Sequence, residues 1–243
     1  MPEFTVDWFD ARTPQIGAAI QQFRDRPAVR MLEIGAYEGR STLWYLDHIL
    51  TGPGSHLTTV DHWRGSAEND PEEMTAVYDR FCRNTGRYVA EGRLTVVSAE
   101  SQVFLASCIA ARGQGDEACG YHIIYLDGSH AAPDVLSDSV MSWSLLEPGG
   151  VLIVDDYLWT GMATEQDRPR FAVDSFLACF LGQYDEVYRG YQMIVRKRGG
   201  PAVPAPGPYA PPTPSRGVVN EKENDAEHPA RRQRGKRVAP PSA

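Results

Sequence analysis

The sequence has no apolar run of about eighteen residues, and acidic residues rather than an apolar stretch occur near its start. A membrane-spanning helix and a secretory signal are therefore not expected. Its four cysteines are widely spaced and none forms a Cys-x-x-Cys pair. This spacing disfavours a disulfide framework or a structural zinc site. We predict a cytoplasmic protein with free thiols and no membrane partner.

Basic residues are scarce before position 199. The chain has a formal net charge of −8, although positions 199–243 alone carry an excess of basic residues. The remainder is therefore more acidic than the whole, whereas binding to phosphate backbones needs a basic surface. We expect no nucleic acid partner for the folded part, and we favour a small-molecule substrate.

Composition changes abruptly after Arg198. Ten of the 18 prolines lie in positions 199–243. Such a segment cannot bury enough apolar surface to offset the entropy lost on ordering, so we predict a disordered, Pro-rich, basic tail at 199–243. The rest is predicted to comprise an N-terminal lid or helical segment at 1–28 and one domain at 29–198, which suits a chain of this length.

Short β-branched segments alternate with longer amphipathic segments along the predicted domain. The expected strands cover 29–34, 57–61, 94–97, 121–127, 151–155, 186–188 and 192–196. Helices are expected at 14–26, 39–49, 70–84, 101–112, 133–146 and 170–181. This alternation predicts an α/β fold with a parallel sheet covered on both faces. The last two strands are too close for a crossover helix, so they must form an antiparallel hairpin.

Ligands of an open parallel sheet bind beyond the carboxyl ends of the strands, where the strand order reverses. Carboxylates occupy nearly all of these predicted positions: Glu33, Asp61, Glu100, Asp127, Asp155 and Asp156. The first strand also runs into Gly35, and Gly39 opens the next helix. A glycine at such a junction lets the backbone turn sharply and approach a ligand closely.

The first loop differs from the fingerprint of dinucleotide-binding folds. It lacks the third glycine, and Glu33 would repel a diphosphate bound at the helix N-terminus. A sulfonium cation with an amino-acid tail carries no phosphate and tolerates carboxylates nearby. Asp61 ends the second predicted strand, where an acid can hold both ribose hydroxyls with its two oxygens.

The segments 32–39, 59–61 and 146–152 resemble motifs of the class I S-adenosylmethionine-dependent methyltransferases. The likeness spans about residues 29–197 and implies a Rossmann-like, seven-stranded mixed sheet whose last strand is antiparallel, flanked by helices. It further implies a set of cofactor-binding residues: Gly35, Ala36 and Gly39 at the methionine portion, Asp61 at the ribose, and Ala99, Glu100 and Ser101 at the adenine. Glu33 and Asp127 complete the predicted cofactor site.

A second group of acids suggests where the chemistry takes place. Asp127, Asp155 and Asp156 follow two adjacent predicted strands, and crowded carboxylates have raised pKa values or require a cation. Oxygen ligands suit Mg²⁺, which would lower the pKa of an acceptor hydroxyl. His130, three residues beyond Asp127, would then remove the proton as a general base.

This combination resembles the metal-dependent O-methyltransferases of macrolide-sugar and aminocoumarin antibiotic pathways, and related cephalosporin-pathway proteins. The resemblance implies that Asp127, Asp155 and Asp156 are Mg²⁺ ligands. It also implies that His130, in the Asp-x-x-His arrangement, is the catalytic base.

Several functions remain open from sequence alone. The leading hypothesis is an S-adenosylmethionine-dependent methyltransferase that acts on a small-molecule hydroxyl, with Mg²⁺ and a histidine base. The nearest alternative is a metal-free N- or O-methyltransferase with the same cofactor site. An NAD-dependent oxidoreductase, disfavoured by the first loop, and a non-catalytic cofactor-binding protein are alternatives from other classes. The sequence is compatible with a monomer or a homo-oligomer, and several acceptors would suit such a fold.

Overall fold

The computed structural model of the chain describes residues 1–65 and 71–199. Its strands are β1 (Arg30–Ile34), β2 (His56–Asp61), β3 (Leu94–Ser98), β4 (Tyr121–Leu126), β5 (Leu146–Val154), β6 (Tyr184–Arg189) and β7 (Met193–Lys197). Its α-helices are α1 (Thr13–Ile20), α2 (Arg40–His48), α3 (Pro71–Ala90), α4 (Ser101–Gly113), α5 (Ala132–Leu145) and α6 (Pro169–Cys179). In this part of the chain no helix is long and apolar enough to cross a membrane.

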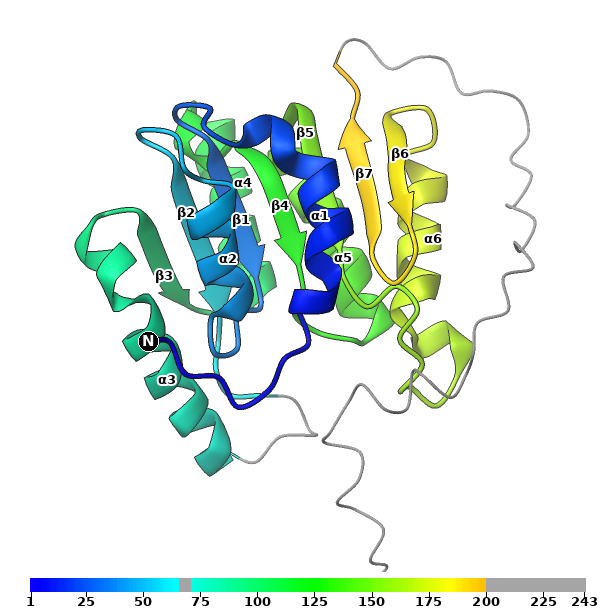
Figure 1. The fold of residues 1–243 in the computed structure, drawn as a ribbon. Coiled ribbons are helices and arrows are strands. Elements are labelled where there is room, and N and C mark those ends of the chain that lie inside the picture. Colours follow the sequence, from blue (N-terminus) through cyan, green and yellow to red (C-terminus); the bar gives the residue numbers. More distant parts are fainter. Residues whose placement is uncertain (66–70, 200–243) are drawn as a thin grey trace, which may run out of the picture. The chain divides into compact units, whose positions relative to one another are not determined.

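The strands form one seven-stranded sheet in the order β3-β2-β1-β4-β5-β7-β6 (Figure 1). Neighbouring strands from β3 to β5 are parallel, whereas β7 pairs antiparallel with both β5 and β6. The predicted α/β mixed sheet with an antiparallel final strand is therefore confirmed. The chain builds outward from β1 to β3 and then returns to β4 on the other side of β1. The strand order thus reverses between β1 and β4, which is where such folds bind their ligands.

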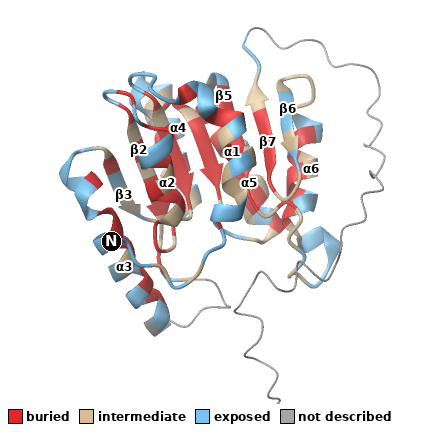
Figure 2. Cartoon of the chain, viewed as in Figure 1, coloured by how far each residue is buried: buried red, intermediate tan, exposed pale blue. Residues whose placement is uncertain are grey.

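Each face of the sheet is covered by its own set of helices. One core layer joins the sheet to α1, α2 and α3, and a second layer joins it to α4, α5 and α6. Figure 1 shows α1 and α2 in front of the sheet, and the strands between the layers are largely buried in Figure 2. Burial on both faces explains why the central strands are nearly continuous apolar runs rather than alternating ones.

Some element boundaries differ from those expected. The fifth strand begins at Leu146, five residues before the predicted start, because Leu146 pairs with Tyr121 and the register then shifts before Ile123. The Pro148-Gly149-Gly150 segment thereby lies within an irregular strand that follows directly on the end of α5 at Leu145. Helix α3 continues to Ala90 instead of ending near position 84. Asp70, the predicted start of this helix, and nearly all of the predicted tail at 199–243 lie outside the described residues.

The first 28 residues pack against the sheet's α1–α3 face. Phe9 is buried among the rings of Trp44, Tyr45 and Tyr125, with ring centres between 5.6 and 6.1 Å apart. Thr5 donates two hydrogen bonds, through its amide and its hydroxyl, to the carboxylate of Glu38. This segment is thus part of the folded body, and its role as a lid stays a prediction.

Candidate active site

The loop after β1 passes directly against the end of β4. Gly35 has φ of +83°, and a Cβ atom at this position would lie 2.0 Å from the backbone oxygen of Asp127. Gly39 has φ of +84°, and its Cβ would lie 2.9 Å from Thr85 and 3.0 Å from Phe81. Both glycines are therefore required by close packing as well as by a left-handed backbone. The predicted cofactor loop lies at the reversal point of the sheet.

Asp61 ties this loop to the end of β2. One carboxylate oxygen, Oδ2, accepts hydrogen bonds from the amides of Ala36 (2.9 Å) and Tyr37 (3.2 Å), and Oδ1 accepts one from the amide of Trp63 (2.7 Å). These contacts were not foreseen from the sequence. A carboxylate offers about four acceptor positions, so Asp61 can keep these three bonds and still accept from a ligand hydroxyl.

Glu33 is enclosed in the core. Its side chain has 0% exposed surface, and the carboxylate accepts hydrogen bonds from the hydroxyls of Ser41 (2.6 Å), Thr42 (2.6 Å) and Thr59 (2.8 Å). Burial raises its pKa from 4.5 to about 7, against the opposing effect of these hydroxyls. Its predicted contact with the cofactor stays a prediction. In the structure, Glu33 joins β1, α2 and β2.

The predicted adenine-contacting turn follows β3. Glu100 forms ion pairs with Arg64 and, at 3.8 Å, with His62, which connects this turn to the loop after β2. The hydroxyl of Ser101 donates to Asp138 on α5 (2.9 Å), and the amide of Ala99 donates to the backbone oxygen of Asp61 (3.3 Å). The turn therefore lies beside Asp61, as the predicted ribose and adenine contacts require. The assignment to adenine stays a prediction.

Two of the predicted catalytic-centre acids share one buried phenol. The hydroxyl of Tyr125 lies 2.9 Å from Oδ2 of Asp127 and is also hydrogen-bonded to Oδ2 of Asp155. Burial, followed by the negative charges of Asp155 and Asp156, raises the pKa of Asp127 well above its usual range. Burial and the charge of Asp156 raise the pKa of Asp155 to about 6. Like charges therefore accumulate where β4 and β5 end.

These carboxylates have the donor chemistry that Mg²⁺ prefers, but they do not form a ligand set. In Asp155, Oδ2 accepts from Tyr125, while Oδ1 accepts from Gln192 (2.8 Å) and from the amide of Asp156 (2.8 Å). The carboxylate of Asp156 instead contacts His130. No group of three His, Cys, Asp or Glu side chains suited to a metal ion occurs within residues 1–65 and 71–199. The expected three-aspartate site is thus not assembled, because internal donors hold Asp155 and a histidine holds Asp156.

His130 and Asp156 form a pair across the ends of β4 and β5. The Nε2 atom of His130 lies 2.8 Å from Oδ2 of Asp156, and the imidazole stacks on Trp159 with ring centres 4.3 Å apart. The hydroxyl of Tyr191 is hydrogen-bonded to Asp156. Burial and the negative charge of Asp156 raise the pKa of Tyr191. Asp156, predicted as a metal ligand, and Trp159 both belong to the loop after β5. The structure brings both of them to His130.

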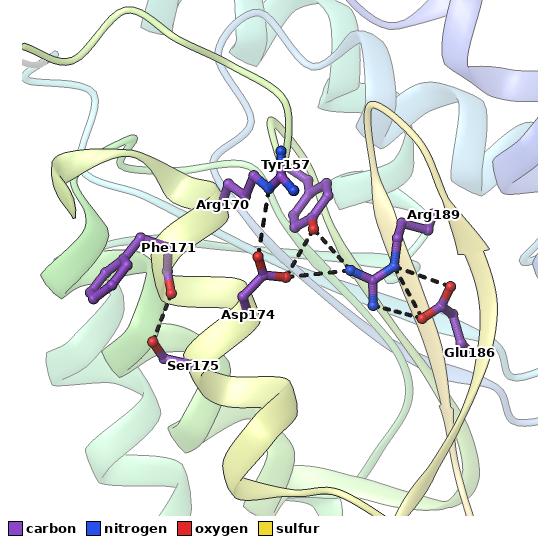
Figure 3. Close-up of polar contacts among 7 residues, drawn as sticks. All are labelled: Tyr157, Arg170, Phe171, Asp174, Ser175, Glu186 and Arg189. Carbon is purple, nitrogen blue, oxygen red and sulfur yellow. Dashed lines mark hydrogen bonds and ion pairs between the residues drawn. The ribbon is translucent and has the colours of Figure 1, made fainter. Parts of the chain in front are cut away.

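The loop that carries Asp155 and Asp156 is anchored by the next residue, Tyr157 (Figure 3). Its buried hydroxyl donates to Asp174 on α6 (2.9 Å) and accepts from Arg189 on β6 (2.9 Å). Arg189 in turn pairs with Glu186 at 2.7 Å. This network fixes the loop after β5 against two further elements, so the position of the acids depends on residues far away in sequence.

A cavity of about 480 Å³ lies at the opposite edge of the sheet. It is lined by Arg30, His122 and Glu147, near the amino ends of β1, β4 and β5, and by Arg112 at the end of α4. Glu147 pairs with Arg112 (3.0 Å) and with Arg30 (3.9 Å), so much of the charge in this cavity is already neutralised. It is separate from the predicted cofactor site.

The model of a methyltransferase-domain family matches residues 32–157, more than half of the chain. The chain belongs to this methyltransferase family. The matched region begins in β1 and ends just beyond Asp155 and Asp156, so it includes every predicted cofactor, metal and base residue. Together with the sheet order, the match identifies a class I S-adenosylmethionine-dependent methyltransferase. No curated protein matches the chain.

Solved structures share this fold. An O-methyltransferase from Bacillus cereus in complex with SAH is 19% identical, with a TM-score of 0.54, and the match covers 81% of this chain and 84% of that one. A protein from Corynebacterium glutamicum is 16% identical, with a TM-score of 0.54 and coverage of 78% and 82%. MycE, from the mycinamycin biosynthetic pathway, in complex with Mg and SAH, is 15% identical with a TM-score of 0.53, and the match covers 81% of this chain but 51% of MycE. At these identities the likeness shows the fold alone.

Proposed function

We propose that this methyltransferase transfers a methyl group to a hydroxyl of a small molecule, with His130 as the general base. The observation that carries the proposal is the His130–Asp156 pair at the carboxyl ends of β4 and β5. This pair lies at the same edge of the sheet as Gly35, which packs closely against the backbone of Asp127. This placement supports the proposal, because a base there would lie on the side of the sheet where the strand order reverses.

The loops around Asp61 suit S-adenosylmethionine. Gly35, Ala36 and Gly39 would surround its methionine portion, because the positive φ of both glycines turns the loop sharply beside the end of β1. The partly exposed carboxylate of Asp61 would accept from a ribose hydroxyl, and the turn at 99–101 would border the adenine. When bound, the cofactor supplies an electrophilic methyl group on a positively charged sulfur.

The His130–Asp156 pair defines how the proton would move. With Nε2–H donated to Asp156, the neutral imidazole presents Nδ1 as the acceptor, a tautomer that follows from this hydrogen bond. Nδ1 would take the proton of the acceptor hydroxyl as its oxygen attacks the methyl carbon. The bound cofactor would supply the methyl group and would keep the electron pair of its carbon–sulfur bond. Asp156 would stabilise the resulting imidazolium, and stacking on Trp159 would hold the ring in place.

Mg²⁺ assistance is the second candidate, favoured by the like charges of Asp127, Asp155 and Asp156. The structure of MycE contains Mg and SAH. In this chain, however, Asp155 is engaged on both oxygens. We therefore assign no proton or methyl transfer step to a metal, and metal dependence becomes an outcome of the experiment.

The test combines cofactor binding with methyl transfer. Isothermal titration of the full chain with S-adenosylmethionine and with NAD should show binding of the former only. Labelled S-adenosylmethionine is then offered with paired acceptors that differ in a hydroxyl or an amine, and with RNA. We expect labelled product from hydroxyl acceptors. Transfer only to amines or RNA, or tight cofactor binding without transfer to any acceptor, would overturn the proposal.

The base is tested with His130→Ala and a matched control. Loss of a general base lowers turnover by roughly 10²- to 10⁴-fold, while the Kd for S-adenosylmethionine should stay the same. His48→Ala provides the control, since His48 ends α2 and is exposed at the other edge of the sheet. Equal turnover of the two variants would remove His130 from the mechanism.

A further inference from the structure

Two fully buried tyrosines lie next to each other beneath the candidate active site. Tyr125 belongs to β4 and Tyr45 to α2, and their ring centres are 5.5 Å apart. Neither side chain has exposed surface. Their hydroxyls differ sharply, because that of Tyr125 contacts two carboxylates, whereas that of Tyr45 has no hydrogen-bond partner in the described part of the chain.

The phenol of Tyr125 connects two neighbouring strand ends. Leu126 and Val154 are aligned in the sheet, so Asp127 and Asp155 extend side by side from β4 and β5. The hydroxyl lies 2.9 Å from Oδ2 of Asp127 and bonds to Oδ2 of Asp155. Because a phenol has a single proton, it donates to one carboxylate at a time, and the second contact needs the proton that a raised pKa keeps on Asp127. The phenol thus links the two acids through shared hydrogen bonds, which lowers the cost of holding them close together.

The orientation of Asp155 is passed on to the base. Its second oxygen accepts from the amide of Asp156 (2.8 Å), and the carboxylate of Asp156 in turn holds Nε2 of His130 (2.8 Å). Asp156 has φ of +57°, an unusual conformation for a residue other than glycine. Its backbone therefore needs support from its surroundings, and the bond to Asp155 supplies part of it.

A second side chain fixes Asp155 from the opposite direction. Gln192, between β6 and β7, is fully buried and donates to Oδ1 of Asp155 (2.8 Å). Gln15 on α1 donates to Gln192 in turn (3.2 Å). Asp155 thus accepts hydrogen bonds from β4 and from the β6–β7 connection. Through the amide of Asp156 it links both of them to the Asp156–His130 pair.

We infer that Tyr125 is a positioning residue for methyl transfer: its hydroxyl holds Asp127 and Asp155 in place, and through Asp155 it orients the Asp156–His130 pair. Its effect on catalysis rests on the proposed function, whereas its effect on the two carboxylates does not. Tyr125 itself touches neither substrate nor cofactor, since it is fully buried. Tyr45 cannot have this role, because its hydroxyl contacts no carboxylate of the described residues.

Two matched substitutions, Tyr125→Phe and Tyr45→Phe, test this inference. Each removes one oxygen from a fully buried ring in the same part of the core. We expect Tyr125→Phe to lower kcat by on the order of tenfold to a hundredfold, the effect of misplacing a reacting group, with the Kd for S-adenosylmethionine unchanged. Tyr45→Phe should keep both values. Equal kcat for Tyr125→Phe and wild type would overturn the inference, as would equal losses in the two variants.

A double-mutant cycle separates positioning from general weakening of the core. If Tyr125 acts through Asp155, adding Tyr125→Phe to Asp155→Asn should cost much less than adding it to the wild type, because residues in contact are not additive. Full additivity would contradict the inference. Should Tyr125→Phe fail to fold, Gln192→Met removes the other side-chain donor to Asp155 at similar volume. A wild-type kcat in Gln192→Met would then overturn it.

Carboxyl ¹³C NMR of aspartate-labelled protein provides a readout without turnover. The signals of Asp127 and Asp155 should shift in Tyr125→Phe and stay in place in Tyr45→Phe. If the wild type transfers no methyl group to any acceptor, the proposed function fails, yet this measurement still tests the contacts of Tyr125 with Asp127 and Asp155. Unchanged carboxyl signals in Tyr125→Phe would refute these contacts whatever the reaction.

Discussion

The carboxyl group of Glu33 makes the stability of this fold depend on pH. Its side chain is completely enclosed, and burial raises its pKa from 4.5 to about 7. Between these two pH values the folded protein keeps a proton that the unfolded chain has released. Because the folded state binds more protons in this window, this group's contribution to stability is fully present below pH 4.5. It falls as the pH rises and stops changing above about pH 7.

The size of the effect follows from the two pKa values. A raised pKa of this size corresponds to a loss of about 3 kcal/mol of unfolding free energy once the folded carboxyl is ionised. Glu33→Gln removes the titration and keeps the shape of the side chain. We therefore expect the variant to gain about 3 kcal/mol over the wild type between pH 4.5 and pH 8, with about 2 kcal/mol of the gain reached by pH 6.

Urea unfolding of both proteins across this pH range measures the difference directly. Other buried acids, such as Asp138 with a pKa raised to about 6 by burial, titrate in both proteins and cancel in the comparison. Glu91→Gln, at a half-exposed glutamate just after α3, is the matched control for replacing a glutamate by glutamine outside the core. A difference for Glu33→Gln that does not change with pH would refute the assignment of Glu33 as a protonated core residue.

Three further predictions concern the loop, the cofactor and the metal. Gly35→Ala should cost at least about 3 kcal/mol of unfolding free energy, because the new Cβ meets the backbone of Asp127. Gly54→Ala, at a similar positive φ in open space, should cost about 1–2 kcal/mol from backbone strain alone. Equal losses in a denaturant series would contradict the packing argument. Asp61→Asn should weaken S-adenosylmethionine binding by about tenfold or more in a calorimetric titration, since a charge-assisted hydrogen bond is lost, and an unchanged Kd would remove Asp61 from the site. Treatment with EDTA should leave methyl transfer unchanged, and a loss that added Mg²⁺ restores would favour the metal-assisted alternative.

The succession of strands and helices could be predicted because it depends on local features. β-branched runs, amphipathic segments and glycine or proline stops lie within a few residues of one another, and they locate most of the described elements to within a few positions. The fifth strand was misplaced at its start because Leu146 joins the sheet through Tyr121 on another strand. Such pairing depends on a neighbour that local patterns do not contain.

The hydrogen-bond partners of Glu33 show the same limit, while its predicted cofactor contact stays a prediction. A carboxylate after an apolar run, just before a glycine-rich loop, was expected to face the cofactor. In the fold, hydroxyls from α2 and β2 converge on it, and burial keeps it in the core. Only the three-dimensional arrangement shows that Ser41, Thr42 and Thr59 surround one side chain.

The set of residues at one edge of the sheet follows from the sequence, because the carboxyl ends of parallel strands all point the same way. Gly35, Asp61, Asp127, Asp155 and His130 are all predicted at that edge from strand order alone. Their partners depend on the packing of the folded chain, which joins Tyr125 to Asp127 and Asp155, and Asp156 to His130. Strand order places residues within about a few ångströms of each other, but hydrogen-bond partners are selected by side-chain packing around each of them.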